Sequence, residues 1–309
     1  MIPFYDTAMT SLLRACAVTA AAVLCAPAAV FAADPCADFT PQPKPQNAGR
    51  DVVGQDVDTI IDRGWIRFAV YADYPPYSWQ QNGTPRGVDV DIARLVADAM
   101  GVEARFDFVG ASETLDADLR NYIWKGPVVG GSVSNVMMRV PYDSAYACRV
   151  EQVTFTGIYA SESIAIAYDV AHYPDGGPVP AYFRFDSVAV ENDSIADFYL
   201  TGFAGGQLAR GVHRYPDMQD AMAALSSGAV MAAMGPKAQL EYGLAPSLAV
   251  HQPPLAGFAR SKWLIGVALH FGYKPLGYAV DDAIRAALED GRIPAIYADY
   301  GLTFQPPEW

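Results

Sequence analysis

Residues 65–79 read WIRFAVYADYPPYSW, a short apolar strand that ends in a turn rich in aromatic residues and stiffened by two prolines. An Asn82-Gly83 turn follows, and residues 87–96 have the pattern of an amphipathic helix. Residues 102–108 then alternate apolar and polar side chains, as a second strand does. The pattern predicts a β-loop-α-β unit with an aromatic turn after its first strand. Because ligands of open α/β sheets bind outside the carboxyl ends of strands, this turn is a candidate binding site.

The same run resembles the opening of the bacterial extracytoplasmic solute-binding proteins of family 3, the type that binds polar amino acids. That family reads roughly as a strand, D-Y-P-P-F-S-F, N-G, G-F-D-V-D-L-A, a helix and G-V. The matching residues here are 73–79, 82–83, 87–93 and 101–102, and the resemblance covers about residues 57–301. It implies an α/β periplasmic binding protein with two lobes, each a mostly parallel sheet flanked by helices. Two crossing strands would form a hinge that closes around a solute.

Composition limits the classes of function. The chain has 309 residues, of which 52% are hydrophobic and 18% are charged. This is enough apolar material for one large or two medium domains. The formal net charge of -13 argues against nucleic acid and anionic membrane surfaces as partners, because both attract basic proteins.

The N-terminal region reads as a secretory signal peptide, which we assign to residues 1–32, with Met1 or Met9 as the start. The alanine-rich apolar stretch has Arg14 as its only basic residue and ends in Val30-Phe31-Ala32, a pattern that suits cleavage before Ala33. A retained membrane anchor is disfavoured because the apolar run is short. A lipoprotein modified at Cys25 is disfavoured by the bulky Leu24. We therefore expect a periplasmic protein, a monomer without a membrane anchor.

Removal of the signal peptide leaves two cysteines, Cys36 and Cys148. An even pair in an oxidising compartment predicts a disulfide, which would pin the irregular N-terminal arm of residues 33–55. Two buried free thiols are the alternative. The sequence has no C-x-x-C motif, which disfavours a redox function.

Strands and helices alternate along the chain, and the alternation restarts near residue 160, which predicts α/β architecture with two similar lobes. The C-terminal helices resemble the family's ending, which returns the chain to the first lobe. We therefore expect the first lobe at residues 56–160 and 263–309 and the second at 161–262.

The resemblance also implies a site between the lobes. In the family's amino-acid binders an arginine holds the ligand carboxylate, and Arg149 falls on that position within residues 146–159. A guanidinium binds a carboxylate through two parallel hydrogen bonds; an ordinary surface arginine is the alternative. The expected ligand-binding residues are Asp73, Tyr74, Tyr77, Trp79, Ser132, Arg149, Asn192, Asp193 and Ser194.

The second lobe departs from the family's amino-acid binders. Pro236 falls near the position where they carry an aspartate that pairs with the ligand's ammonium group. A desolvated ammonium without a partner is unfavourable, although Asp193 could substitute. We therefore expect a small polar or anionic ligand rather than a standard amino acid, delivered to an ABC permease.

Residues 118–143 are longer, more aromatic and richer in glycine and methionine than in ordinary members of the family. They resemble a subgroup that accompanies periplasmic quinoprotein alcohol dehydrogenases, the methanol-oxidation accessory proteins. This implies an alternative function, a non-transport protein that binds a quinoprotein dehydrogenase. The candidate partner-binding residues are Trp124, Met137, Met138 and Tyr142. The alternative for the two methionines is the core of a strand.

The sequence carries no catalytic or cofactor motif. The four histidines lack metal-ligand spacing, and no P-loop or dinucleotide fingerprint is present. We therefore expect no cofactor, no metal and no enzymatic activity. The family includes rare enzymes such as cyclohexadienyl dehydratases, so a catalytic carboxylate at Glu191 or Asp193 stays an alternative.

Overall fold

The computed structural model describes residues 34, 36–40, 53, 55–129, 131–258 and 260–308. The signal peptide and most of the arm expected up to residue 55 lie outside the described residues. Residues 35–309 form one compact unit.

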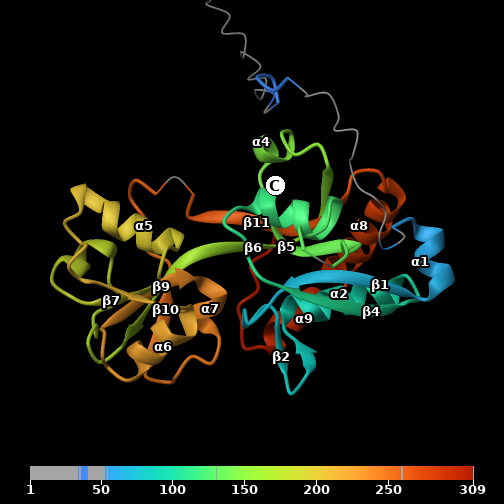
Figure 1. Ribbon diagram of the computed structural model, residues 1–309. Helices are drawn as coiled ribbons and strands as arrows, with labels where there is room; N and C mark the ends of the chain where they lie inside the picture. Colours follow the sequence, from blue (N-terminus) through green and yellow to red (C-terminus); the bar gives the residue numbers. More distant parts are fainter. Residues whose placement is uncertain are drawn as a thin grey trace, which may run out of the picture. The chain divides into compact units, whose positions relative to one another are not determined.

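Along the described residues, nine strands join one sheet in the order β4-β1-β5-β11-β6-β9-β7-β8, with β10 also paired to β6. Figure 1 shows the long strand β6 running between the two groups of strands. In chain order these strands are β1 (Trp65–Tyr71), β4 (Glu103–Val109), β5 (Val136–Tyr142), β6 (Val153–Asp169), β7 (Val188–Glu191), β8 (Val212–Tyr215), β9 (Ala232–Pro236), β10 (Leu248–His251) and β11 (Lys262–His270). A separate hairpin consists of β2 (Trp79–Gln81) and β3 (Thr84–Arg86).

The sheet contains two groups of parallel strands. Strand β1 runs parallel to β4 and β5, and β7 runs parallel to β8 and β9. We call the first group with its helices lobe 1 and the second group with its helices lobe 2. The 17-residue strand β6 pairs antiparallel with β11, β9 and β10, so it belongs to both lobes. The two-lobed α/β fold class that the sequence predicted is confirmed, and the exact limits of the lobes stay a prediction.

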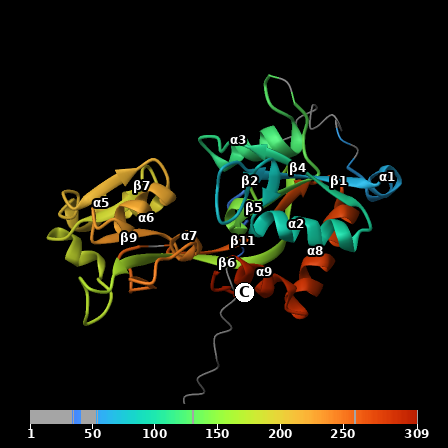
Figure 2. The same cartoon turned by 90° about the horizontal axis from the view of Figure 1, so that it is seen from below.

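Helices flank the strands of each lobe (Figure 2). In chain order they are α1 (Val57–Arg63), α2 (Val88–Ala99), α3 (Leu115–Leu119), the π-helix η1 (Arg120–Trp124), α4 (Ser144–Ala147), the 3-10 helix η2 (Pro180–Arg184), α5 (Ile195–Gly202), the 3-10 helix η3 (Phe203–Gly205), α6 (Met218–Ser226), α7 (Lys237–Glu241), α8 (Lys274–Glu289) and α9 (Arg292–Asp299).

The apolar sides of the longer helices pack on the sheet. In lobe 1, Ile92 of α2 and Ile284 of α8 lie in one core with Phe68 of β1. In lobe 2, Val188 and Ala189 of β7 belong to two different cores, because successive strand residues point to opposite faces. Helices α5 and α6 therefore cover opposite faces of the same strands.

The turn after β1 is fixed by its contact with the start of α2. The backbone nitrogen of Asp89 donates to the carbonyl of Tyr77 at 2.9 Å. Gly87 precedes α2 with φ +123°, and a Cβ at this position would lie 2.2 Å from the Tyr77 carbonyl oxygen. Only glycine fits both the backbone angle and the contact, so Gly87 holds the aromatic turn against the helix.

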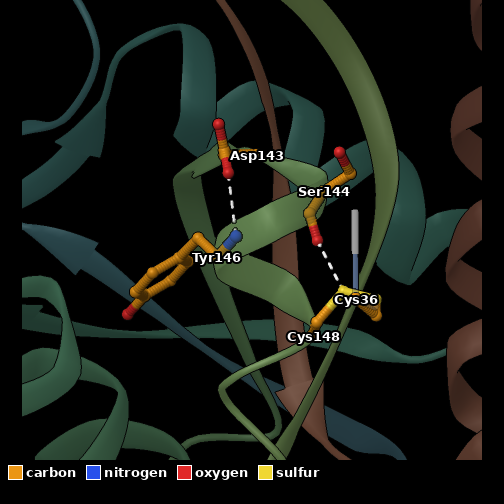
Figure 3. Close-up of a disulfide and its surroundings, with 5 residues drawn as sticks. All are labelled: Cys36, Asp143, Ser144, Tyr146 and Cys148. Atoms are coloured by element: carbon orange, nitrogen blue, oxygen red, sulfur yellow. Dashed lines mark hydrogen bonds between the residues drawn. A yellow bond between two sulfur atoms is a disulfide. The ribbon is translucent and has the colours of Figure 1, made fainter. Parts of the chain in front are cut away.

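A disulfide joins Cys36 to Cys148, with 5.7 Å between the Cα atoms (Figure 3). Cys148 follows the short helix α4, whose N-cap Asp143 accepts a hydrogen bond from the backbone nitrogen of Tyr146 at 2.8 Å. The pair is the one expected from the sequence, and it ties the described part of the N-terminal arm to lobe 1.

Candidate functional site

A cavity of about 380 Å³ lies where β1, β5, β6, β9 and β11 come together. We call it the Arg139 cavity. Its volume is within the range of small-molecule sites in proteins. Its lining residues are Tyr71, Tyr74, Ala111, Ser112, Glu113, Thr114, Leu115, Asp118, Arg139, Pro141, Glu162, Pro236, Trp263 and Ile265.

Arg139 reaches the cavity because β5 is irregular at this residue. Its φ is +59°, and the register between β5 and β11 shifts between Gly266 and Ala268. Bulges of this kind redirect a side chain and are frequent next to functional sites. A non-glycine residue in this conformation costs about 1–3 kcal/mol, which the surrounding structure must offset. The strand thus accepts local strain at the residue whose guanidinium lines the cavity.

The guanidinium of Arg139 is only 7% exposed and lies among aromatic rings and carboxylates. It sits 3.0 Å from the ring centroid of Tyr77. Its Nη2 donates to Glu162 Oε2 at 2.8 Å, and its Nη1 lies 3.8 Å from Asp89 Oδ1. Nη1 has no hydrogen-bond partner among the described residues although it is buried. One donor of this cation is therefore unsatisfied.

Both carboxylates beside Arg139 are held by tyrosines. Glu162 Oε2 also accepts from the Tyr77 hydroxyl at 2.5 Å, and Asp89 Oδ1 accepts from the Tyr159 hydroxyl at 2.7 Å. Burial raises the pKa of Asp89 to about 6, against the lowering effect of Arg139. Burial also raises the pKa of Tyr77 well above its ordinary value, so this phenol stays a neutral donor. The cluster combines one permanent cation with a carboxyl group that titrates near neutral pH.

The lining of the cavity carries further carboxylates. Buried Asp118 accepts from the Tyr71 hydroxyl and from the backbone nitrogen of Ser112, both at 2.8 Å. These two bonds fix the segment after β4 against the wall of the cavity. Glu113, in the same segment, is exposed and makes no hydrogen bond or ion pair within the described ranges. It is available to a bound cation.

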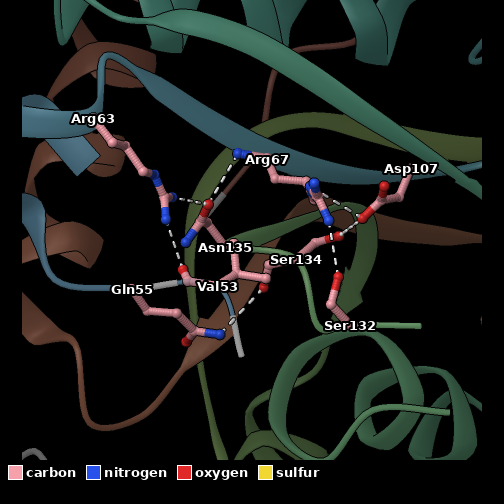
Figure 4. Close-up of polar contacts among 8 residues, drawn as sticks. All are labelled: Val53, Gln55, Arg63, Arg67, Asp107, Ser132, Ser134 and Asn135. Atoms are coloured by element: carbon pink, nitrogen blue, oxygen red, sulfur yellow. Dashed lines mark hydrogen bonds and ion pairs between the residues drawn. The ribbon is translucent and has the colours of Figure 1, made fainter. Parts of the chain in front are cut away.

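Of the expected ligand-binding residues, Tyr74 lines the Arg139 cavity. Tyr77 does not line it, but its hydroxyl donates to the lining residue Glu162. Trp79 lines a different cavity. Asp73 is exposed in the turn. Ser132 accepts from Nη1 of Arg67 at 2.8 Å, within a polar network that also includes Asp107 and Ser134 (Figure 4).

The expected clamp, Arg149, is exposed in the turn after α4 and does not line the cavity. The loop before α5 does not line it either. There, Ser194 caps the helix by accepting from the backbone nitrogen of Asp197, and Asn192 donates to Asp193. Their roles as ligand contacts stay predictions without a contact that supports them.

The expected partner-binding residues need one correction. Met137 and Met138 are buried in β5 and belong to the core, so they offer no surface to a partner. The alternation of a sheet strand places them on opposite faces, and both faces are covered. Trp124 is half-buried against the core of lobe 1, and half-buried Tyr142 lies opposite Leu264 of β11.

Sequence reasoning did not single out Arg139, Glu162 or the buried role of Asp89. A signal was present, because Arg139 and Glu162 each interrupt an apolar strand in the sequence. Lone charges in such strands are rarely buried unless they are paired.

No group of three or more His, Cys, Asp or Glu side chains is placed to hold a metal ion in the part of the chain that the structure describes. Among those same residues, no helix combines the length and the apolar character that crossing a bilayer requires.

A sequence model of the family described as bacterial extracellular solute-binding proteins, family 3, matches residues 66–121, from β1 into η1. The match covers less than half of the chain and includes the aromatic turn and α2. No curated protein matches the chain.

Solved structures match over most of the chain. An ancestral cationic amino acid solute-binding protein, AncCDT-1, has a TM-score of 0.65 and 20% identity, over 79% of this chain and 99% of that one. Another structure of AncCDT-1 is described as a precursor of cyclohexadienyl dehydratase. An amino acid ABC transporter substrate-binding protein from Streptococcus pneumoniae, bound to L-arginine, has a TM-score of 0.55 and 19% identity, over 81% and 99%.

A histidine kinase sensor domain with similarity to periplasmic binding proteins has a TM-score of 0.52 and 24% identity, over 78% of this chain and 97% of that one. At these identities the likeness shows the fold, which is that of the periplasmic binding proteins.

Proposed function

We propose that the protein is a periplasmic solute-binding protein that captures a small polar solute in the Arg139 cavity without chemical turnover. The observation that carries the proposal is Arg139, a residue of the cavity lining whose buried Nη1 makes no hydrogen bond within the described residues. Buried donors without partners are rare in native proteins, because leaving one unpaired costs about 1–3 kcal/mol. An oxygen atom of a bound solute would supply the missing acceptor.

The charges of the lining favour a solute that has both an acceptor and a cationic group. Buried Arg139 offers a donor in the lining of the cavity, and exposed Glu113 offers a free carboxylate. The sequence argument against amino acids relied on Pro236 in place of a carboxylate. Pro236 lines the cavity, and so do the carboxylates of Asp118 and Glu162, beside which a ligand's ammonium group could lie. Amino acids, including the cationic ones named for similar structures, belong among the candidate solutes.

In this proposal the lobes expected at residues 56–160 with 263–309 and at 161–262 close around the solute, and an ABC permease recognises the loaded form. Closure around a ligand is the usual motion of two-lobed binders. The family match in lobe 1 and the fold support this assignment.

Calorimetric titration with L-arginine, L-glutamine, succinate and glucose tests the proposal, with Arg139→Lys and Arg149→Ala as matched variants. Lysine keeps the charge but loses the planar fork of donors, so we expect Arg139→Lys to weaken binding by about tenfold or more. Arg149→Ala, at an exposed position, should bind as the unmodified protein does.

Two results would contradict this reading. Heat changes absent for all four compounds would remove the support for solute capture. Binding that Arg149→Ala abolishes and Arg139→Lys leaves intact would instead restore the clamp expected from the sequence. Circular dichroism of each variant checks that the fold is retained.

A second candidate function is the accessory role, in which the protein binds a periplasmic quinoprotein dehydrogenase. The observation that favours it is an apolar loop after η1, where Val128 is 82% exposed and Val129 is 91% exposed. Adjacent exposed apolar side chains are typical of protein-binding surfaces. Size-exclusion chromatography with a purified quinoprotein methanol dehydrogenase tests the idea. A complex that Val128→Ser with Val129→Ser dissolves would support this role, and independent elution would exclude this dehydrogenase as the partner.

A further inference from the structure

A second cavity, of about 670 Å³, shares no lining residue with the Arg139 cavity. We call it the Trp79 cavity. Its size also falls within the range of small-molecule sites. The lining comes from the β2-β3 hairpin, α2, the residues that follow α7, and the end of α9 with the residue after it. These residues are Trp79, Gln81, Arg86, Asp91, Arg94, Tyr242, Gly243, Asp299 and Tyr300.

Three aromatic rings form one wall of the Trp79 cavity. The centroid of the Trp79 ring is 5.7 Å from that of Tyr242 and 5.7 Å from that of Tyr300, with interplanar angles of 54° and 75°. All three rings are partly exposed. Because the planes are strongly tilted, they leave no parallel slot of the kind that would sandwich a flat heteroaromatic ring. A puckered ring with C–H groups on its face can still pack on each ring separately.

Three polar side chains of the lining, those of Asp91, Arg94 and Tyr300, are held by hydrogen bonds. Asp91 Oδ1 accepts from Arg94 Nη1 at 2.7 Å, and Asp91 Oδ2 accepts from the Tyr300 hydroxyl at 2.6 Å. Arg94 Nη2 donates to the carbonyl of Pro85 at 2.9 Å. The Tyr300 hydroxyl itself accepts from the backbone nitrogen of Gly87 at 2.9 Å. These bonds preorganise one face of the cavity, which lowers the entropy that a ligand must overcome on binding.

Two further lining residues are available to a ligand. Arg86 and Asp299 are exposed, and neither side chain makes a hydrogen bond or ion pair within the described ranges. The two arginines and two aspartates of the lining balance in charge, so neither an anion nor a cation is favoured overall. Guanidinium and amide groups supply donors and carboxylates supply acceptors. The cavity therefore suits a neutral ligand that has many hydroxyl groups.

We propose that the Trp79 cavity is a second binding site, specific for a neutral saccharide. A sugar ring has C–H faces that pack on aromatic rings and hydroxyl groups that both donate and accept hydrogen bonds. Tilted rings, balanced charge and a mixed set of donors and acceptors match these properties together. The proposal does not depend on solute capture in the Arg139 cavity, because the two sites share no residue.

Titration with cellotriose, maltotriose and chitotriose tests the site, followed by tryptophan fluorescence and by ligand-observed NMR. We expect saturable binding of at least one trisaccharide. Trp79→Ala should weaken it by about tenfold, as the loss of an aromatic contact does. Arg86→Ala combined with Asp299→Ala should also weaken binding. That double variant removes no bond that the structure uses, so it keeps the test meaningful if Trp79→Ala fails to fold.

Phe185→Ala is the matched control, because Phe185 is an aromatic residue that is 85% exposed and lies outside the cavity. It and Arg139→Lys should leave saccharide binding unchanged. The absence of binding for all three trisaccharides would overturn the proposal. So would binding that is equally strong in the double variant, or binding that Phe185→Ala weakens as much as Trp79→Ala does.

Discussion

Replacement of Asp89 by asparagine should change how the stability of the protein depends on pH. Asp89 is 1% exposed, and burial raises its pKa from the ordinary 3.8 to about 6. A carboxyl group whose pKa is raised by folding binds more protons in the folded than in the unfolded state. The free energy of unfolding therefore falls as pH rises through this window, from about 3.8 to about 6.

The magnitude follows from the two pKa values. Their difference corresponds to about 3 kcal/mol, at roughly 1.4 kcal/mol per pKa unit. Asparagine does not titrate. As the pH rises from about 4 to about 8, the free energy of unfolding of the variant should therefore increase by about 3 kcal/mol relative to that of the unmodified protein. Its Oδ1 can still accept from Tyr159, while its amide hydrogens add a cost that does not depend on pH. The diagnostic quantity is therefore how steeply the difference in the free energy of unfolding, variant minus unmodified protein, rises with pH. The size of that difference at any single pH is not diagnostic.

Urea unfolding of the Asp89→Asn variant and the unmodified protein at a series of pH values measures this slope. Asp282→Asn, which removes an exposed carboxylate from α8, is the control for the loss of one negative charge. A flat difference for Asp89→Asn, or one that falls with pH, would refute the reasoning. A flat difference would mean that Arg139 stabilises the Asp89 carboxylate as much as burial destabilises it, and a falling one that Arg139 outweighs burial.

Two further predictions concern the scaffold. Gly87→Ala should lower the free energy of unfolding by about 3 kcal/mol or more, because the backbone angle and the contact with Tyr77 both exclude a Cβ; thermal unfolding measures the loss, and an unchanged midpoint would contradict it. The double variant Cys36→Ser with Cys148→Ser should lower the free energy of unfolding by about 4–5 kcal/mol under oxidising conditions, because the disulfide spans a sequence separation of 112 residues. The same midpoint for the unmodified protein with and without reductant would count against that estimate.

The opening unit of the fold could be predicted because its signals are local. The apolar alternation of β1 and β4, the Asn82-Gly83 turn and the periodicity of α2 each depend on neighbours in the sequence. The second lobe repeats the alternation of strands and helices, so local patterns also predicted its elements. The pairing order of the strands, in which β6 joins both lobes, depends on contacts between distant segments that local patterns do not contain.

The site was harder to predict for the same reason. Arg149 was chosen by its place in a motif, but the chain makes the short helix α4 there and leaves the side chain exposed. Arg139 reaches the cavity because its φ is positive and the strand register shifts nearby. A strand pattern in the sequence predicts neither feature. Glu162 and Asp89 join it from β6 and α2, so the cluster exists only once the sheet is assembled.

The same cluster is better explained by binding than by stability. Removing charges from water is expensive, and apolar replacements of buried ion pairs are often as stable or more stable by about 1–4 kcal/mol. Here three ionisable groups are buried together, one of them with a pKa raised to about 6, and Arg139 also occupies a strained backbone position. A structural ion pair would engage every donor, yet the buried Nη1 of Arg139, a residue that lines the cavity, makes no hydrogen bond within the described residues. An arrangement that weakens the free protein and leaves one strong donor of a cavity-lining residue without a hydrogen bond is expected where a ligand completes it.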